Sequence, residues 1–333
     1  MMNNNDIMVT VFCLAYNHEK YIRQCLDGFV KQKTSFKYEV IVHEDASTDS
    51  TADIIREYES KYPNIIKPIY QKENQYNKGF YYTEEFCLKN AKGKYIALCE
   101  GDDFWTDDQK LQKQVDAMEK NPSCKMCLCK VRAVQENGER MEQTYPNFEM
   151  NTGVYHTEEL LKIICKEYSF QTSSYFFEKE KLKEYFDEKP SFFRVAPVGD
   201  WPYLLYFSQF DIYYIDDEMS CYRKNAIGNF STTMSSSSVE AQKKYYMSMI
   251  AMIEAFDQYT QYQYHDSCNH FDRFYRYYYT LLIQEQNYTE IFGNKIYRKM
   301  LNEERRSDRL AIKCDYYCPW ALKIMKKIKN NEK

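Results

Sequence analysis

The amino-acid sequence predicts an α/β fold: a mostly parallel sheet flanked by helices, followed by a C-terminal helical region. Short apolar and β-branched runs alternate with segments whose apolar residues recur at helical spacing, through roughly the first third of the chain. Helical crossovers between such strands make the strands parallel and cover both faces of the sheet. After residue 231 the strand-like runs stop, and only the helical spacing continues.

Two strand–helix units open the chain. Residues 9–14 form a continuous β-rich run, and the apolar residues of 22–30 share one helical face. Residues 38–43 form a second short apolar strand. The polar segment 47–51 offers several N-caps for the helix that follows it. The unit of strand, turn and helix is therefore repeated.

Two further strands complete the first part of the sheet. Residues 65–70 are predicted as the third strand, and Thr83 is expected to cap a helix over 84–91 whose acidic first turn favours the helix dipole. Gly93 ends that helix before the fourth strand, 95–99. Ligands of such sheets bind beyond the carboxyl ends of the strands, so the candidate site lies in the residues that follow them.

The middle of the chain continues the alternation. A core helix, a strand with an Asn137-Gly138 hairpin turn, a further strand and a charged helix are expected in turn. A loop over 190–201 then opens a last helix, for which Asp200 is a candidate N-cap. The predicted elements are the helix 107–120, the strands 124–134 and 171–177, and the helices 178–185 and 201–207.

The C-terminal part is of a different kind. The Ser and Thr cluster 231–238 is typical of a linker or a mobile loop that closes over a site. Aromatic residues at helical spacing follow from residue 239, which favours helix-on-helix packing, with sugar stacking as the alternative. Residues 319–333 predict either an amphipathic helix at an anionic membrane or a terminal helix packed on the domain.

Charge and apolar content exclude several classes of protein. The 45 Lys and Arg residues against 49 Asp and Glu give a net charge of -4, so we expect no nucleic-acid partner. The sequence contains no apolar run of membrane-spanning length, and its N-terminus lacks the basic and apolar regions of a signal peptide. A cytoplasmic location is expected.

The 12 cysteines are interpreted as reduced thiols, because the chain is long and carries no secretory signal. Cys124, Cys127 and Cys129 form a cluster inside the apolar run 124–134, and no second ligand pair follows at zinc-site spacing. These three residues are therefore expected in a core strand.

Acidic residues follow two of the predicted strands. Glu44 and Asp45 end the second strand, and Asp102 and Asp103 come just after the fourth. These acids would repel one another unless a metal ion, a ribose or a base edge lies between them. Helix capping is the alternative role for each pair. No glycine-rich phosphate loop follows the first strand, so the diphosphate of a bound nucleotide would need a metal held on carboxylates.

These motifs resemble those of family 2 glycosyltransferases, which have the GT-A fold. The resemblance extends over about residues 7 to 230. It is carried by 11–17 (VFCLAYN), 40–49 (VIVHEDASTD), 93–103 (GKYIALCEGDD), 198–201 (VGDW) and 221–223 (CYR).

The resemblance implies an inverting, metal-dependent transferase that takes a sugar from a nucleotide-diphosphate donor, UDP-sugar above all. It implies a donor half over 1–115, an acceptor half over 116–230 and a separate helical region over 231–333. The acceptor would be a glycan or a lipid-linked glycan in cell-envelope or exopolysaccharide synthesis. The location would be cytoplasmic, with peripheral contact at the inner face of the plasma membrane through 319–333.

The resemblance also implies roles for individual residues. Asp103 is assigned to Mn²⁺ or Mg²⁺ and is expected at a strand end outside the core, and Asp102 is assigned to ribose or the metal. Asp200 is the general base, with Gly199 allowing close approach and Trp201 walling the acceptor sugar. The uridine of the donor would contact Ala15, Tyr16, Asn17, Glu44 and Asp45.

The sequence departs from the family pattern at three places. The acid pair is Glu44-Asp45 rather than two aspartates, and Ala46 stands where glycine is common. Lys224 follows Arg223 where family members often carry histidine, so Arg223 or Lys224 is expected to reach the diphosphate.

Two other classes of protein are weighed against a transferase. A sugar nucleotidyltransferase should show a glycine-rich basic loop after the first strand, where this chain has Tyr16-Asn17-His18-Glu19. A non-catalytic carbohydrate-binding protein of the same fold would have no need of the acids. A retaining transferase stays open, because inversion is implied only by the resemblance.

Overall fold

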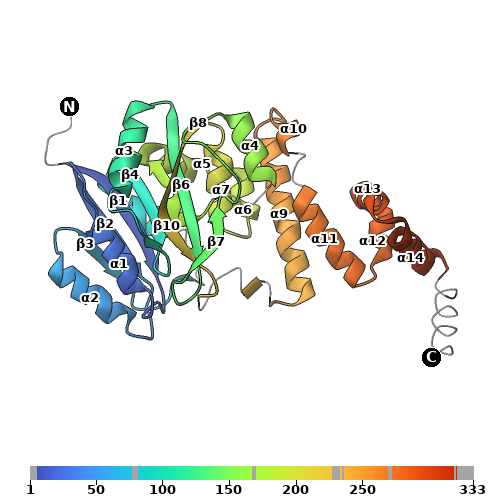
Figure 1. The fold of residues 1–333 in the computed structure, drawn as a ribbon, viewed down its shortest axis with the longest axis horizontal. Helices are drawn as coiled ribbons and strands as arrows, with labels where there is room; N and C mark the ends of the chain where they lie inside the picture. The colour runs from blue at the N-terminus through green and yellow to red at the C-terminus, as the bar shows by residue number, and fades with distance from the viewer. Residues whose placement is uncertain are drawn as a thin grey trace.

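The computed structural model describes residues 6–76, 82–166, 170–226, 233–234, 236–268, 272–318 and 320. Within these ranges ten strands form one sheet in the order β3-β2-β1-β4-β9-β6-β10-β5, with β7 beside β6 and β8 beside β10 (Figure 1). The strands are β1 (Ile7–Ala15), β2 (Lys37–Glu44), β3 (Ile66–Tyr70), β4 (Tyr95–Glu100), β5 (Phe104–Trp105), β6 (Cys124–Val134), β7 (Arg140–Tyr145), β8 (Gly153–Tyr155), β9 (Phe176–Glu178) and β10 (Asp211–Arg223).

The first four strands are parallel, as predicted. β1 pairs with β2 and with β4, and β2 pairs with β3. The crossover helices α1 (Ile22–Val30) and α2 (Thr51–Lys61) connect the first three. The carboxyl ends of β1, β2 and β4 therefore meet at one edge of the sheet.

The second half of the sheet is mixed. β9 runs antiparallel to both β4 and β6, whereas β10 runs parallel to β6. The predicted Asn137-Gly138 turn joins β6 to the antiparallel β7. The predicted α/β fold, with a mostly parallel sheet and C-terminal helices, is confirmed.

Alternate residues of the central strands supply two hydrophobic cores. Val9, Val11 and Cys13 of β1 face α1, α2 and α3 (Lys110–Lys120). Phe12 of the same strand faces the opposite core. That core includes residues of α4 (Thr157–Lys166), α5 (Lys179–Glu188), α6 (Ser191–Val195) and α7 (Asp200–Phe207). Both faces are covered, which explains why the strands are apolar throughout rather than alternating.

Two predicted elements take a different form. Thr83–Leu88 is a π-helix rather than an α-helix over 84–91, and the Thr83 hydroxyl accepts a hydrogen bond from Tyr203 at 3.0 Å instead of capping it. The predicted strand 171–177 is a 3-10 turn, Thr172–Ser174, followed by the short β9. The side chains of Trp105 and Gln114 donate hydrogen bonds to the carbonyls of Ser173 and Ser174 in this turn. These two carbonyls are therefore not used for strand pairing.

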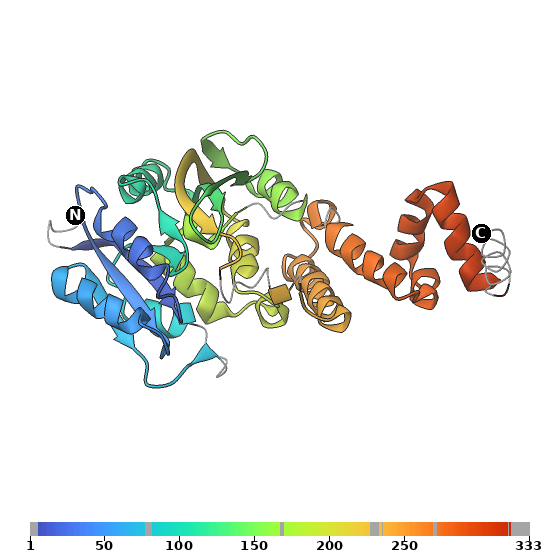
Figure 2. The same ribbon diagram turned by 60° about the horizontal axis from the view of Figure 1, so that its bottom comes forward.

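The helices from α9 onward extend away from the sheet (Figures 1 and 2). Phe192 of α6 packs on Phe256 of α9, and Trp201 packs on Phe274 of α11, so aromatic rings join this region to the sheet domain. The predicted helix-on-helix packing is confirmed by a separate core around Leu282 and Met300. The helices are α9 (Val239–Tyr259), α10 (His265–Cys268), α11 (Asp272–Gln284), α12 (Tyr288–Gly293), α13 (Lys295–Glu303) and α14 (Arg306–Tyr317).

Three expectations meet the limits of the described residues. The amphipathic segment 319–333 lies outside them except for Trp320, and the cluster 231–238 is described only in part. The eleven cysteines whose side chains the structure describes are free thiols, and Cys124, Cys127 and Cys129 are buried in β6 as predicted. Within the described ranges no helix is long and apolar enough to cross a membrane.

Candidate functional site

Hydrogen bonds tie together the three loops at the carboxyl edge of the sheet. The Asp45 amide donates to the Ala15 carbonyl at 3.0 Å, and the Gly101 amide donates to the Leu14 carbonyl at 2.8 Å. A Cβ atom at position 101 would lie 2.7 Å from Nδ1 of His18, so only glycine fits there. The loops after β1, β2 and β4 therefore form one connected surface.

Hydrogen bonds join the loop after β1 to the loop after β2. The Asn17 amide donates to the Ser47 hydroxyl at 3.0 Å, and the Thr48 amide donates to the Asn17 side-chain oxygen at 2.8 Å. Glu44 accepts from the Ser47 amide at 2.7 Å, a bond within the loop that precedes α2. Ala46 has a φ of 59°, a left-handed conformation that explains why glycine is common at this position.

Asp45 lies at the back of these loops and is buried. Its two carboxylate oxygens accept hydrogen bonds from the Gln75 amide at 2.8 Å and the Tyr82 hydroxyl at 3.1 Å. A carboxylate has further lone pairs, so a base N–H can still bind. Tyr16, by contrast, is 43% exposed beside Asn17, and its ring is open to a ligand.

Three acids follow β4 in close succession. Desolvation of the Glu100 carboxyl, followed by the charges of Asp102 and Asp200, raises its pKa to about 8. Burial, with the charges of Asp102 and Glu100, also raises the pKa of Asp103 well above its usual range.

Asp102 and Asp103 differ in their contacts. Asp103 is only 3% exposed, and its Oδ1 accepts a hydrogen bond from the Arg223 amide at 2.9 Å. The expectation that Asp103 lies outside the core is therefore wrong, because the end of β10 covers it. The carboxylate of Asp102 accepts no hydrogen bond from the described residues, so it is the freer of the two.

Arg223 is buried beneath the acids. Its Nε donates to the Asp102 carbonyl at 2.9 Å, and its two terminal nitrogens donate to the Glu136 carbonyl and the Gln24 side chain. The guanidinium also lies over the rings of Tyr21 and Phe104. These contacts fix the loop that carries the acids, whereas the Lys224 side chain donates to Gln143 of β7.

Asp200 begins α7, and its Oδ1 accepts the amide N–H of Trp201 at 2.9 Å. Its charge contributes to raising the pKa of Glu100 and of Tyr175, so Asp200 lies within electrostatic range of the acid loop. Trp201 is 2% exposed and packs on Phe274, so the expectation that it walls the acceptor sugar is wrong. A Cβ at Gly199 would meet nothing within 4 Å, which leaves open space beside Asp200.

Two side chains at this edge received no role from the sequence. The hydroxyl of Tyr175 and the Nδ1 atom of His18 are buried and have no hydrogen-bond partner in the described part of the chain. Burial, followed by Asp200, raises the pKa of Tyr175 well above its usual range. The apolar run around Tyr175 indicated only a strand, and the order of the sheet was needed to place this residue between β4 and α7.

The acids can hold a metal only in part. The described residues contain no group of three His, Cys, Asp or Glu side chains placed to bind a metal ion by themselves. Mg²⁺ and Mn²⁺ in nucleotide enzymes commonly use one or two carboxylates, with phosphate oxygens and water as the remaining ligands. Asp102 and Asp103 fit that smaller ligand set.

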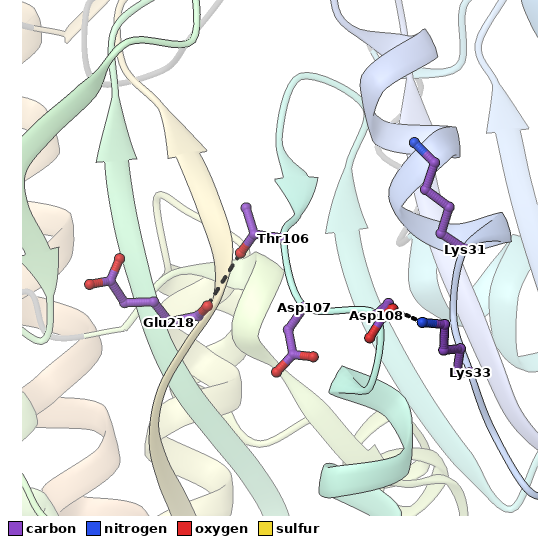
Figure 3. Close-up of a pocket in the computed structure, with 6 residues that line it drawn as sticks. All are labelled: Lys31, Lys33, Thr106, Asp107, Asp108 and Glu218. Carbon is purple, nitrogen blue, oxygen red and sulfur yellow. Dashed lines mark hydrogen bonds and ion pairs between the residues drawn. The ribbon is translucent and has the colours of Figure 1, made fainter.

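A separate hollow of about 720 Å³ lies at the opposite edge of the sheet, near the ends of α1 and β5 (Figure 3). Its charged side chains all have ion-pair partners, most of them outside the hollow. Lys33 binds Asp108, and the Thr106 hydroxyl donates to the Glu218 carbonyl at 3.3 Å. It lies away from the carboxyl ends of β1, β2 and β4, and we do not assign the reaction to it.

The sequence also matches a known protein family. The sequence profile described as "Glycosyl transferase family 2" matches residues 10–186, which is more than half of the chain. The chain belongs to this family. An uncharacterized protein of Mycobacterium tuberculosis, Rv1520, is 33% identical over 220 residues, covering 66% of this chain and 60% of the relative. The chain thus spans about 60% of the length of that relative.

Two family neighbours carry informative names. The Escherichia coli UDP-Glc:alpha-D-GlcNAc-diphosphoundecaprenol beta-1,3-glucosyltransferase WfaP is 34% identical over 112 residues, covering 34% of this chain and 41% of WfaP. The structure of S. aureus TarS 1-349 in complex with UDP-GlcNAc matches with a TM-score of 0.55 at 23% identity. The match covers 75% of this chain and 66% of that one. The TarS likeness supports the GT-A fold.

Proposed function

We propose that this chain transfers a sugar from a nucleotide-diphosphate donor, a UDP-sugar, to a saccharide or lipid-linked acceptor with inversion. The observation that carries the proposal is the arrangement at the sheet edge. Three loops joined by hydrogen bonds bring Glu100, Asp102 and Asp103 together, and the charge of Asp200, from another element, acts on this cluster. Family membership and the donor named for WfaP support the same reaction.

The nucleoside of the donor would lie on the loops after β1 and β2. The exposed ring of Tyr16 offers a stacking surface, and the buried Asp45 offers an acceptor for a base N–H. Ala15, Asn17 and Glu44 shape this surface mainly through their contacts within it. Arg223 supports the neighbouring acid loop from below.

The diphosphate would lie over Asp102, with Asp103 beneath it. Bound Mn²⁺ or Mg²⁺ supplies positive charge that stabilises the departing diphosphate. Asp102 is the better ligand, because its carboxylate makes no hydrogen bond within the described structure. Asp103 supports the loop through its bond from the Arg223 amide.

Asp200 would remove the proton from the acceptor hydroxyl as that oxygen attacks the anomeric carbon. It comes from α7, a different element from the acid loop, and the open space beside Gly199 would admit an acceptor. A base standing apart from the metal keeps its basicity. The acceptor class follows the diphosphoundecaprenol-linked glycan named for WfaP, and it suits cell-envelope synthesis in the cytoplasm with peripheral membrane contact through 319–333.

A screen of nucleotide-sugars by thermal shift, with and without Mn²⁺, tests the proposal. A donor that binds the folded state raises the melting temperature by mass action. We expect UDP-sugars to do so more strongly with Mn²⁺ than without it, and the stabilising donor to be consumed when an acceptor is added. If no nucleotide-sugar shifts the melting temperature, the proposal is wrong.

A further inference from the structure

A second pocket lies in the C-terminal helices, outside the residues that the family profile matches. It encloses about 520 Å³ between α9, α10, α11 and α13, a volume within the range of ligand sites, roughly 300 to 1,000 Å³. The walls combine three carboxylates, an imidazole, an arginine, a lysine, a tyrosine and apolar side chains. The residues that matter for its chemistry are Asp257, His265, Tyr275, Arg276, Ile296 and Lys299.

Asp257 is the unusual member of this pocket. It is 7% exposed, and its Oδ2 lies 2.6 Å from Nδ1 of His265. Its other oxygen, Oδ1, is buried and has no hydrogen-bond partner in the described part of the chain. Buried carboxylate oxygens are normally satisfied, so this one indicates a missing donor such as a ligand hydroxyl.

The charges of the pocket indicate a neutral ligand. Arg276 binds Glu303 at 2.6 Å, and the Tyr275 hydroxyl donates to Glu254 at 2.8 Å. Acids and bases along the walls are nearly balanced, with Glu254, Asp257 and Glu303 against Arg276, Lys299 and His265. A phosphate or an acidic ligand would find little net attraction here, whereas a hydroxyl-rich ligand can bond to both signs of charge.

The pocket is connected to the candidate active site along α9. Tyr246, Ile250, Ile253 and Asp257 follow one another at spacings of four, three and four residues, which places them on one face of the helix. At one end Tyr246 stacks on the half-exposed Tyr277, with ring centroids 5.1 Å apart. Its neighbour Tyr245 packs on the core that contains Trp201, and burial, followed by the charge of Asp200, raises the pKa of Tyr245. The other end, about 16 Å along the helix, is the pocket.

We propose that the pocket around Asp257 is a second saccharide-binding site, which holds a distal, neutral part of the acceptor glycan while its end lies at Asp200. The Tyr246–Tyr277 stack supplies a sugar-stacking surface between the two. This inference rests on the proposed function, because it takes the acceptor to be a glycan longer than one sugar.

Isothermal titration of the full chain with neutral β-linked glucose and N-acetylglucosamine oligosaccharides of increasing length tests the inference. We expect the dissociation constant to rise at least about tenfold in Asp257→Ala, the loss of one good hydrogen bond. Ile296→Trp should weaken binding similarly by filling the mouth of the pocket, and the exposed position of Ile296 protects the fold. The matched control Asp308→Asn removes an exposed charge on α14 and should leave binding unchanged.

The outcomes separate this inference from the proposed function. Wild-type affinity in both pocket variants, or no oligosaccharide binding by the wild type, overturns the second site. UDP binding measured with Mn²⁺ should be the same in all four proteins. Oligosaccharide binding that depends on Asp257, in a chain that consumes no nucleotide-sugar, supports the second site and contradicts the transferase.

Discussion

The donor side and the acceptor side of the proposed active site are built by different interactions. On the donor side, main-chain amides and short polar side chains join the loops after β1, β2 and β4. On the acceptor side, α7 is buried from Trp201 to Phe207, and aromatic rings of α9 and α11 pack against this part of the molecule. The family match covers the donor side and ends at residue 186, before Asp200.

This difference has a consequence for function. Main-chain contacts depend weakly on side-chain identity, so a donor site built from them can persist while the sequence changes. Aromatic packing depends on the shape of each side chain. We therefore expect the donor half to be shared among relatives and the helical half to determine the acceptor.

The largest expected effect separates the two neighbouring acids. Asp102→Ala and Asp103→Ala should both abolish transfer, because each removes a carboxylate assigned to the metal. Only Asp103→Ala should also lower the free energy of unfolding, by about 1 to 3 kcal/mol, since it leaves the buried Arg223 amide without an acceptor. Transfer assays and urea denaturation measure the two effects. Near wild-type turnover in Asp102→Ala would remove this residue from the site.

The stability of the donor half should depend on pH through His43. This residue is buried in β2 against the ring of Phe86, and burial lowers its pKa from the usual 6.5 to about 4. In the unfolded chain His43 is protonated below about pH 6.5, whereas in the folded chain it stays neutral down to about pH 4. Stability present above pH 6.5 is therefore lost as the pH falls, by up to about 3 kcal/mol.

The variant His43→Leu tests that pH dependence. Urea denaturation at a series of pH values should show a smaller loss of stability between pH 6.5 and 4 than in the wild type. The matched control His156→Leu alters an exposed histidine and should leave the acid dependence over this window nearly unchanged. Identical pH profiles for the wild type and His43→Leu would show that another group controls the acid sensitivity.

Donor affinity should fall when Asp45 is removed. Asp45→Ala takes away an acceptor for the base and a partner of Tyr82 and Gln75, which should weaken UDP binding by about 1 to 3 kcal/mol. Calorimetry with UDP measures the effect. Asp53→Ala, which removes an exposed acid of α2, serves as the control. Unchanged affinity in Asp45→Ala would place the nucleoside elsewhere.

The smallest expected effect is a gain of stability. Ala46 has a left-handed backbone, which costs a non-glycine residue about 1 kcal/mol, so Ala46→Gly should raise the free energy of unfolding by up to about that amount. Urea denaturation measures it. Ala52→Gly on α2 is the opposite control and should destabilise, because glycine is a poor helix former. A less stable Ala46→Gly protein would show that the loop does not carry this strain.

The parts that could be predicted from the sequence are those with local signals. Apolar runs predicted β1, β2, β4 and β6 within a few residues, and the acids after β2 and β4 marked the sheet edge before any geometry was known. A resemblance in motif order supplied Asp200, which no local pattern distinguishes from a helix cap.

Contacts between distant segments could not be predicted in this way. The burial of Asp103 depends on the end of β10, about 120 residues later. Trp201 is buried because α11 covers it. Thr83 does not cap its helix because its hydroxyl oxygen accepts a hydrogen bond from Tyr203. The Asp257 pocket likewise depends on how four helices pack together, and the apolar pattern of each separate helix does not predict that packing.

One variant tests the central claim that the two sides meet at a single reaction. Asp200→Asn removes the proposed base and leaves the donor loops intact, so transfer should fall by about 10² to 10⁴ while UDP affinity stays unchanged. The measurement combines UDP titration with transfer rates for this variant and the anomeric configuration of the wild-type product, which should be inverted. Full activity in Asp200→Asn, or a retained configuration, would contradict the account.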